Sequence, residues 1–168
     1  MSFDERIHEI ISLSEAMRLN VLIWGPGKGA EKDYAKREKI RRKIKHVFVN
    51  ADVRFSEDLE SGTPASKDLT LPEQELLHLA ACDICLVLDV SKGAGEEIAH
   101  FIGSVFAHKL VILTHERYKG VTSFPAELRK YENQLFYSDE EYDQCHLVER
   151  ILSRIRLLAV GKMGQLFL

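Results

Sequence analysis

The chain has 168 residues, of which 45% are hydrophobic and 29% charged, and its formal net charge is -3. This predicts one globular domain over residues 1–168, and the acidic balance argues against a dedicated nucleic-acid binder, which usually gathers a basic excess on one face. No apolar stretch reaches the roughly 18 residues of a membrane span, and charged residues interrupt the start of the chain where a signal peptide is apolar. We therefore expect no membrane partner and a cytoplasmic location.

Apolar periodicity predicts an amphipathic helix over residues 4–18, an extra helix before the first strand. Five short strands are then expected at residues 20–24, 47–49, 84–88, 110–113 and 135–137. The intervening helices are expected at residues 31–45, 72–81, 96–107 and 141–158, and residues 50–67 are expected to form a long surface loop.

This alternation of strands and helices predicts an α/β fold: a flavodoxin-like, doubly wound, five-stranded parallel sheet with helices on both faces. The apolar run at 84–88 lacks in/out alternation, as a strand buried on both faces does. Open parallel sheets bind ligands beyond the carboxyl ends of their strands, where the strand order reverses. The turns after residues 20–24 and 84–88 are therefore the expected ligand site.

The first of these turns, residues 25–29, reads Gly-Pro-Gly-Lys-Gly, and Trp24, directly before it at the end of the strand, is a predicted substrate contact. The turn matches neither a Walker loop nor a dinucleotide fingerprint. Glycines in such a turn, beside a helix start, offer backbone amides to an anion, so Gly25 and Gly27 are predicted to contact a phosphate. The alternative is that the glycines only make the turn.

The second turn concentrates polar and small residues directly after the 84–88 strand: Asp89, Ser91, Gly93, Gly95, Glu96 and Glu97. Glycines let the backbone approach a ligand closely, so Gly93 and Gly95 are predicted substrate contacts. Adjacent residues on a helix point about 100° apart, so only one of the two glutamates faces a ligand. Glu97 is followed by a buried apolar stripe and is the candidate active carboxylate; alternatively it only caps its helix. Asp89 either orients a substrate hydroxyl or is a turn residue.

The chain shows no clustered ligand spacing among its seven histidines, and we predict no metal and no cofactor. Cys82 and Cys85 form a CxxC, but their odd spacing is expected to send them to opposite faces of an extended segment, so buried packing is favoured over redox or metal use. The basic run 36–45 is expected to coat the exposed side of a helix.

Residues 93–99, Gly-Ala-Gly-Glu-Glu-Ile-Ala, resemble the G-x-G-x-E turn of the nucleoside 2-deoxyribosyltransferase and 2'-deoxynucleoside 5'-phosphate N-hydrolase superfamily. Residues 73–76, Glu-Gln-Glu-Leu, with Asp83 downstream resemble the helix that precedes this strand in the family. The resemblance covers about residues 20–115. TIR-like NAD hydrolases and nucleotide-sensing SLOG domains share the same architecture.

The resemblance implies that Glu97 is the nucleophile, that Glu75 occupies the position of the catalytic aspartate, and that Ser91, six residues before the nucleophile, contacts a phosphate. It also implies a homodimer. Two positions depart from the family: Leu22 stands where a tyrosine points into the site, and Pro26 stands where the hydrolases have a serine.

Three functions follow as hypotheses. The first is an N-glycosidase or N-ribosyl or deoxyribosyl transferase that cleaves the base–sugar bond of a nucleotide or nucleoside, with Glu97 attacking and Glu75 or Asp89 holding the sugar or passing a proton. The second, motivated by Leu22, is a sensor that binds a nucleotide without cleaving it. The third is a structural or interaction protein whose glutamates are surface charge.

Overall fold

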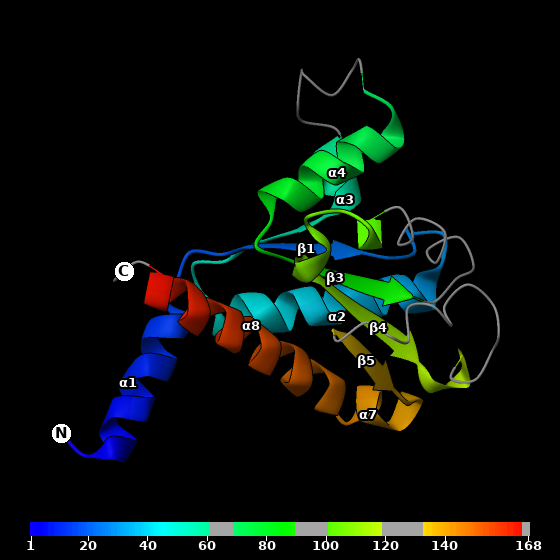
Figure 1. Cartoon of the computed structure of the whole chain (residues 1–168). Coiled ribbons are helices and arrows are strands. Elements are labelled where there is room, and N and C mark those ends of the chain that lie inside the picture. Colours follow the sequence, from blue (N-terminus) through cyan, green and yellow to red (C-terminus); the bar gives the residue numbers. More distant parts are fainter. Residues whose placement is uncertain (61–68, 90–100, 119–132, 166–168) are drawn as a thin grey trace.

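The computed structural model describes residues 1–60, 69–89, 101–118 and 133–165 (Figure 1). At its centre lies a five-stranded, all-parallel sheet in the order β2-β1-β3-β4-β5, which is the flavodoxin-like order predicted. The strands are β1 (Asn20–Trp24), β2 (Asp52–Phe55), β3 (Ile84–Asp89), β4 (Leu110–His115) and β5 (Gln134–Tyr137). The strand order reverses between β1 and β3, so a ligand site is expected at the carboxyl ends of these two strands.

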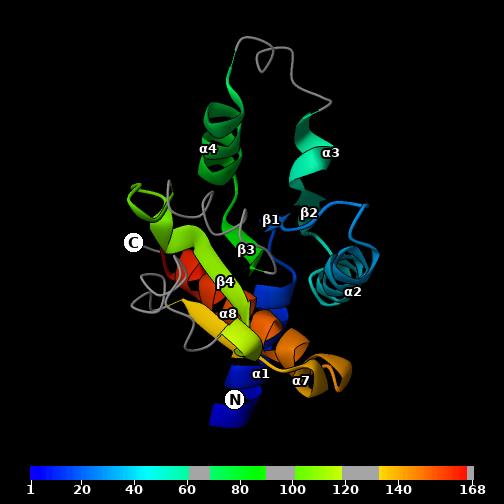
Figure 2. The ribbon, with the colours of Figure 1, turned by 90° about the vertical axis from the view of Figure 1, so that its right-hand side faces the viewer.

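Helices lie on both sides of the sheet (Figures 1 and 2). One side carries α2 (Glu31–Val47) and α8 (His146–Gln165), and the other carries α3 (Ser56–Glu60) and α4 (Leu71–Ala81). Alternate residues of β1 reach different cores: Ile23 packs with the α2 and α8 side, and Leu22 and Trp24 pack with Leu79 of α4. The buried central strands thus supply apolar side chains to both faces.

Shorter elements complete the described chain. They are α1 (Phe3–Glu15), the 3-10 turns η2 (Ala107–Lys109) and η3 (Glu116–Tyr118), and α7 (Asp139–Asp143). Helix α1 begins at a capping box in which Ser2 and Glu5 exchange hydrogen bonds, as predicted for a helix near this position. None of the helices among the described residues is long and apolar enough to cross a membrane.

The second strand was predicted at the wrong place. Residues 47–49 end α2 and start a turn, whereas the strand is β2, inside the segment expected to be a loop. Edge strand β2 buries only Val53 and Phe55 and exposes the charged residues Asp52 and Arg54. Four residues with two exposed charges resemble a polar loop in sequence, and their pairing with β1 decides the structure.

The predicted final helix, 141–158, is two helices. The chain breaks between α7 and α8 at Cys145, whose φ of 66° is not helical. The predicted helix at 96–107 lies partly outside the described residues, and its described end leaves the helix after Ile102.

The two cysteines of the CxxC are buried as predicted, but they share one face of the sheet rather than opposite faces. The prediction of opposite faces was wrong because the strand begins only at Ile84, and Cys82 is the carboxyl cap of α4. Burial is the main reason that the pKa of Cys82 rises to about 12, and burial likewise raises the pKa of Cys85.

Candidate functional site

The carboxyl ends of β1 and β3 lie in direct contact. Trp24 is in register with Val87, and the next residue of β1's chain, Gly25, packs against Leu88. A Cβ on Gly25 would stand 3.0 Å from the Leu88 Cβ, and the φ of Gly25 is +151°, a conformation that side chains disfavour. Gly25 is therefore required both for its backbone angle and for the close approach of the two strands.

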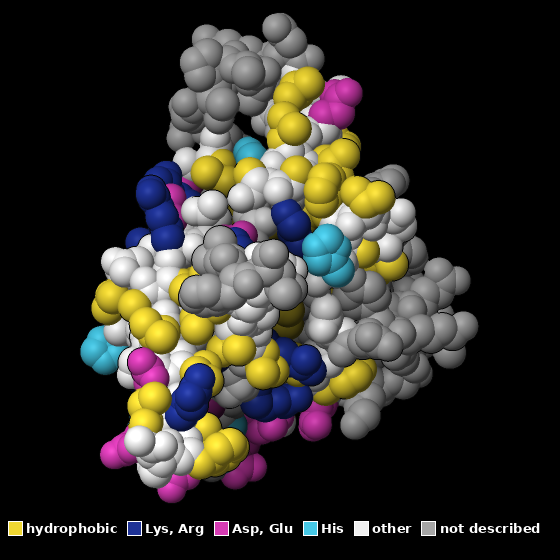
Figure 3. Space-filling view, turned by 60° about the vertical axis from the view of Figure 1, so that its left-hand side comes forward, with side chains coloured by type: hydrophobic (Ala, Val, Ile, Leu, Met, Phe, Trp, Pro, Cys, Tyr) yellow, Lys and Arg dark blue, Asp and Glu magenta, His cyan; other side chains and the backbone are white. Residues whose placement is uncertain are grey.

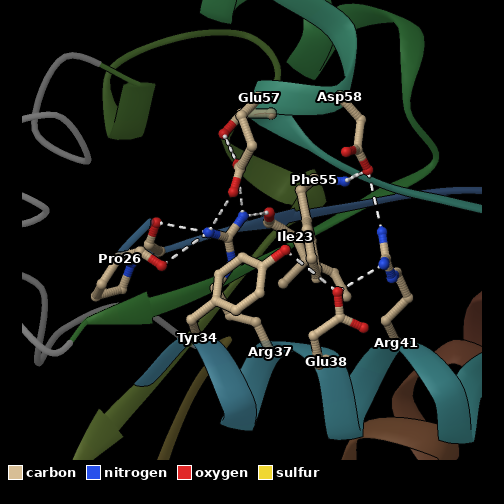
Figure 4. Close-up of polar contacts among 11 residues, drawn as sticks. Ile23, Pro26, Tyr34, Arg37, Glu38, Arg41, Phe55, Glu57 and Asp58 are labelled. Carbon is tan, nitrogen blue, oxygen red and sulfur yellow. Dashed lines mark hydrogen bonds and ion pairs between the residues drawn. The ribbon is translucent and has the colours of Figure 1, made fainter. Parts of the chain in front are cut away.

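A buried arginine holds the turn after β1 in place (Figure 4). Arg37, on the second turn of α2, is fully buried and donates hydrogen bonds to the carbonyl oxygens of Ile23 (2.9 Å), Gly25 (3.0 Å) and Pro26 (2.9 Å). One guanidinium thus donates to three backbone carbonyls at the end of β1 and in the turn that follows it.

The charge of Arg37 is matched by Glu57 of α3. The pair is bidentate, with Nη1–Oε1 at 2.9 Å and Nη2–Oε2 at 2.8 Å, and the guanidinium lies 4.2 Å from the centre of the Phe55 ring. Burial alone would raise the pKa of Glu57, but hydrogen bonds and attraction from Arg37 outweigh it, so this pKa lies below its ordinary value.

A second ion pair joins the same two helices. Arg41, one turn after Arg37, binds Asp58 of α3 at 3.1 Å and Glu38 of its own helix at 2.6 Å. The same Asp58 oxygen accepts the amide of Phe55 at 3.1 Å, at the end of β2. Helix α3 is therefore fixed to α2 by two adjacent arginines (Figure 4).

The orientation of the turn leaves an amide for a ligand. The Pro26 carbonyl points at Arg37, and in a trans peptide the next amide, that of Gly27, points the opposite way, away from the guanidinium. Within the described residues this amide has no acceptor. Helix α2 begins just beyond, at Ala30, whose side chain forms no capping hydrogen bond. Amides of this kind at a helix start favour an anion.

Trp24 supplies a second donor at this edge. Its side chain is buried, and its ring lies 5.1 Å from that of Phe101. The indole Nε1 has no acceptor within the part of the chain that the structure describes. A buried indole N–H normally has a hydrogen-bond partner, so Trp24 is a candidate ligand contact.

Glu75 lies on α4, on the same side of the sheet as Trp24. Its side chain is half-buried, and its negative charge contributes, after burial and Cys82, to the raised pKa of Cys85 in β3. Helix α4 is anchored at its carboxyl end by Lys109, whose Nζ donates to the carbonyls of Leu79 (3.2 Å), Ala80 (2.6 Å) and Cys82 (2.7 Å). Lys109 thus fixes the helix that carries Glu75.

Four of the predicted site residues meet at one edge of the sheet: Trp24, Gly25 and Gly27 at the end of β1, and Asp89, the last residue of β3. The other predicted contacts lie outside the described residues: Ser91, Gly93, Gly95 and Glu97. Within the described chain, no group of three or more histidine, cysteine, aspartate and glutamate side chains is arranged to hold a metal ion.

Sequence reasoning missed Arg37. The basic run 36–45 was expected on an exposed helix side, yet Arg37 is fully buried. Its spacing from Ile40 and Ile44, three and seven residues, places it on the buried stripe of α2, and this pattern was the available signal. The expectation holds for Arg42 and Lys43, which are exposed.

No family model and no curated protein matches the chain. A solved structure, that of a conserved protein from Enterococcus faecalis V583, is similar to it at 16% sequence identity, with 84% of this chain and 99% of that chain covered and a TM-score of 0.43. Because one fold hosts many functions, this likeness assigns no activity.

A separate hollow of about 130 Å³ lies at the opposite edge of the sheet. It is lined at the amino ends of β1 and β2 by Asn20, Leu22 and Asp52, and by His78 and Cys82 of α4 and its cap. Ligands of open parallel sheets bind at carboxyl ends, so this hollow is not the candidate site.

Proposed function

We propose that the carboxyl edge of β1 and β3 binds a nucleotide or nucleoside, and that the protein is an N-glycosidase or an N-ribosyl or deoxyribosyl transferase. Glu97 is the proposed nucleophile, Glu75 and Asp89 are its proposed partners, and Ser91 is a proposed phosphate contact. These roles come from the resemblance of residues 73–76 and 93–99 to the family motifs.

The observation that carries the proposal is the arrangement around Arg37. Because the guanidinium takes the carbonyls of Gly25 and Pro26, the Gly27 amide faces the other way, beside an uncapped helix start. The buried indole N–H of Trp24 lies at the end of the same strand. Donors of this kind at the point where the strand order reverses suit the phosphate or polar edge of a nucleotide.

The proposed reaction proceeds in two displacements. The Glu97 carboxylate attacks the anomeric carbon of the sugar, the carbon–nitrogen bond breaks, and its electron pair leaves with the base, which takes a proton from Glu75 or Asp89. Water then adds to the anomeric carbon, its proton returns to that acid, and the glutamate leaves as carboxylate. In a transferase, the nitrogen of a second base replaces the water.

A second candidate function, a sensor that binds without cleaving, is favoured by Leu22. This residue is 2% exposed and packs in the apolar core with Trp24 and Leu79, so this position of β1 carries no hydroxyl toward a ligand. A sensor predicts binding with no release of base.

The experiment is an incubation of the purified protein with deoxynucleotides, nucleosides and NAD, with free base measured by chromatography. Glu97→Gln should abolish release of base, whereas the neighbouring Glu96→Gln should retain most of it, because the sequence predicts a helix from residue 96 and adjacent residues of a helix point about 100° apart. Full activity in Glu97→Gln would overturn its role. A ligand-dependent rise in Tm with no base released would select the sensor. If no ligand raises the Tm and no base is released, both proposed functions are rejected.

A further inference from the structure

Helix α1 exposes its apolar side chains. Phe3, Ile7, Ile10 and Ile11 are 80%, 40%, 37% and 40% exposed, although their spacing places them on one side of the helix. The amino end of α1 projects away from the sheet in Figure 1. An isolated helix of 13 residues is marginal in water, and most helices owe their stability to a packed apolar face. We therefore expect another surface to pack on the apolar face of α1.

The exposed apolar surface extends to the neighbouring helix. Arg156 of α8 binds Glu15 at the end of α1 at 2.7 Å, which fixes the crossing of the two helices. The residue after Arg156, Leu157, is 67% exposed, and Val160, one turn further, is 38% exposed. Figure 3 shows hydrophobic side chains among charged ones in the lower part of this view, where α1 lies. We define the α1 patch as Phe3, Ile7, Ile10, Ile11, Leu157 and Val160.

The size of the α1 patch matches one half of a stable dimer interface. At about 150–200 Å² for each large apolar side chain, the exposed fractions of its six members amount to roughly 500 Å². A standard interface buries about 800 Å² on each partner, of which about 60% is apolar, again roughly 500 Å². We infer that the α1 patch is the contact between two copies of this chain.

Charges beside the patch fit this assignment. We place the two-fold axis of the dimer at right angles to α1, near Ile7, so that the two α1 helices run antiparallel and the same flank of each faces the other. Arg6 and Glu9 occupy one flank, and within the described residues neither side chain makes an ion pair. The antiparallel arrangement brings Arg6 of one copy within a helical turn of Glu9 in the other. Each dimer then contains this opposite-charge pair twice.

The first test is the molar mass of the full chain in solution, by light scattering and sedimentation. Wild type should have twice the 19.2 kDa mass of the chain. Ile7→Glu/Ile10→Glu should be monomeric at about 100 μM. Val105→Glu is the matched control: Val105 is 81% exposed but outside the α1 patch, so this variant should stay dimeric. A monomeric wild type, or a dimeric Ile7→Glu/Ile10→Glu, overturns the inference.

The second test keeps the apolar residues and exchanges the charges, which guards against a variant that simply unfolds. Arg6→Glu alone and Glu9→Arg alone should each raise the dimer Kd by about tenfold or more, because each creates two like-charge contacts. The double variant Arg6→Glu/Glu9→Arg restores opposite charges and should recover most of the affinity. Failure of the double variant to recover contradicts the antiparallel contact. Binding of a monomeric wild type to lipid vesicles would instead identify the patch as a membrane-surface helix.

Discussion

Arg37 and Glu57 lie 20 residues apart on different helices, yet their side chains form a bidentate ion pair with distances of 2.9 and 2.8 Å. The arginine is fully buried and the glutamate is 33% exposed at its side chain. Because the same guanidinium binds three carbonyls at the end of β1, the pair connects helix α3 to the turn of the candidate site.

Replacement of the arginine should therefore destabilise the whole domain. We expect Arg37→Met to lower the free energy of unfolding by about 2–4 kcal/mol, because the carbonyls of Ile23, Gly25 and Pro26 lose their donor. Arg42→Met is the control, since Arg42 is exposed and makes one 3.4 Å contact with the Glu38 carbonyl. Urea unfolding monitored by circular dichroism measures both. Equal, small effects would show that the network contributes little.

The ion pair also predicts a dependence on pH. The pKa of Glu57 in the folded protein lies below its ordinary value of 4.5, so the unfolded state binds the proton more readily. The stabilisation is fully present above pH 4.5 and is lost as the pH falls through the lower, folded pKa. Glu57→Gln should therefore have a lower free energy of unfolding than wild type at pH 6. This difference in free energy should become smaller as the pH falls toward 3. A difference that is constant with pH contradicts this account.

The two glycines of the turn after β1 should differ in how well they tolerate alanine. Gly25→Ala introduces a Cβ 3.0 Å from Leu88 at a φ of +151°, and we expect a loss of about 1–3 kcal/mol in stability. A Cβ on Gly27 meets no atom within 4 Å, so Gly27→Ala should stay within about 0.5 kcal/mol of wild type. Thermal unfolding of the two variants side by side tests this, and equal stability of the two would contradict it.

Strands β1, β3 and β4 could be predicted from the sequence. A strand in the middle of a parallel sheet is buried on both faces, so its residues form a continuous apolar run, and these three segments show such runs. Strand β2 could not be predicted in this way, because half of its residues face solvent. The strand order was predictable, and the candidate site is a prediction from that order. The role of Arg37 depends on contacts with β1 and α3 that no local pattern encodes.

The three thiols should differ in reactivity. Burial raises the pKa of Cys82 to about 12 and raises that of Cys85, so neither carries appreciable thiolate at pH 8. Cys145 is half-buried. With Ellman's reagent the native protein should react at Cys145 first, and the other two thiols should react only after unfolding. Cys145→Ser should remove the native reaction, and rapid modification of Cys82 in that variant would contradict its buried position.

Lys109 should matter for the position of α4 more than its surface charge suggests. Its ammonium satisfies the carbonyls of Leu79, Ala80 and Cys82, which end the helix that carries Glu75. We expect Lys109→Met to lower the free energy of unfolding by about 1–3 kcal/mol, because hydrogen bonds from a charged donor are lost while the aliphatic stem is kept. Lys43→Met is the control, since Lys43 is exposed and has no hydrogen-bond or ion-pair partner within the described residues. Hydrogen exchange of the α4 amides locates the effect: faster exchange confined to α4 supports the capping role, and unchanged α4 exchange would refute it.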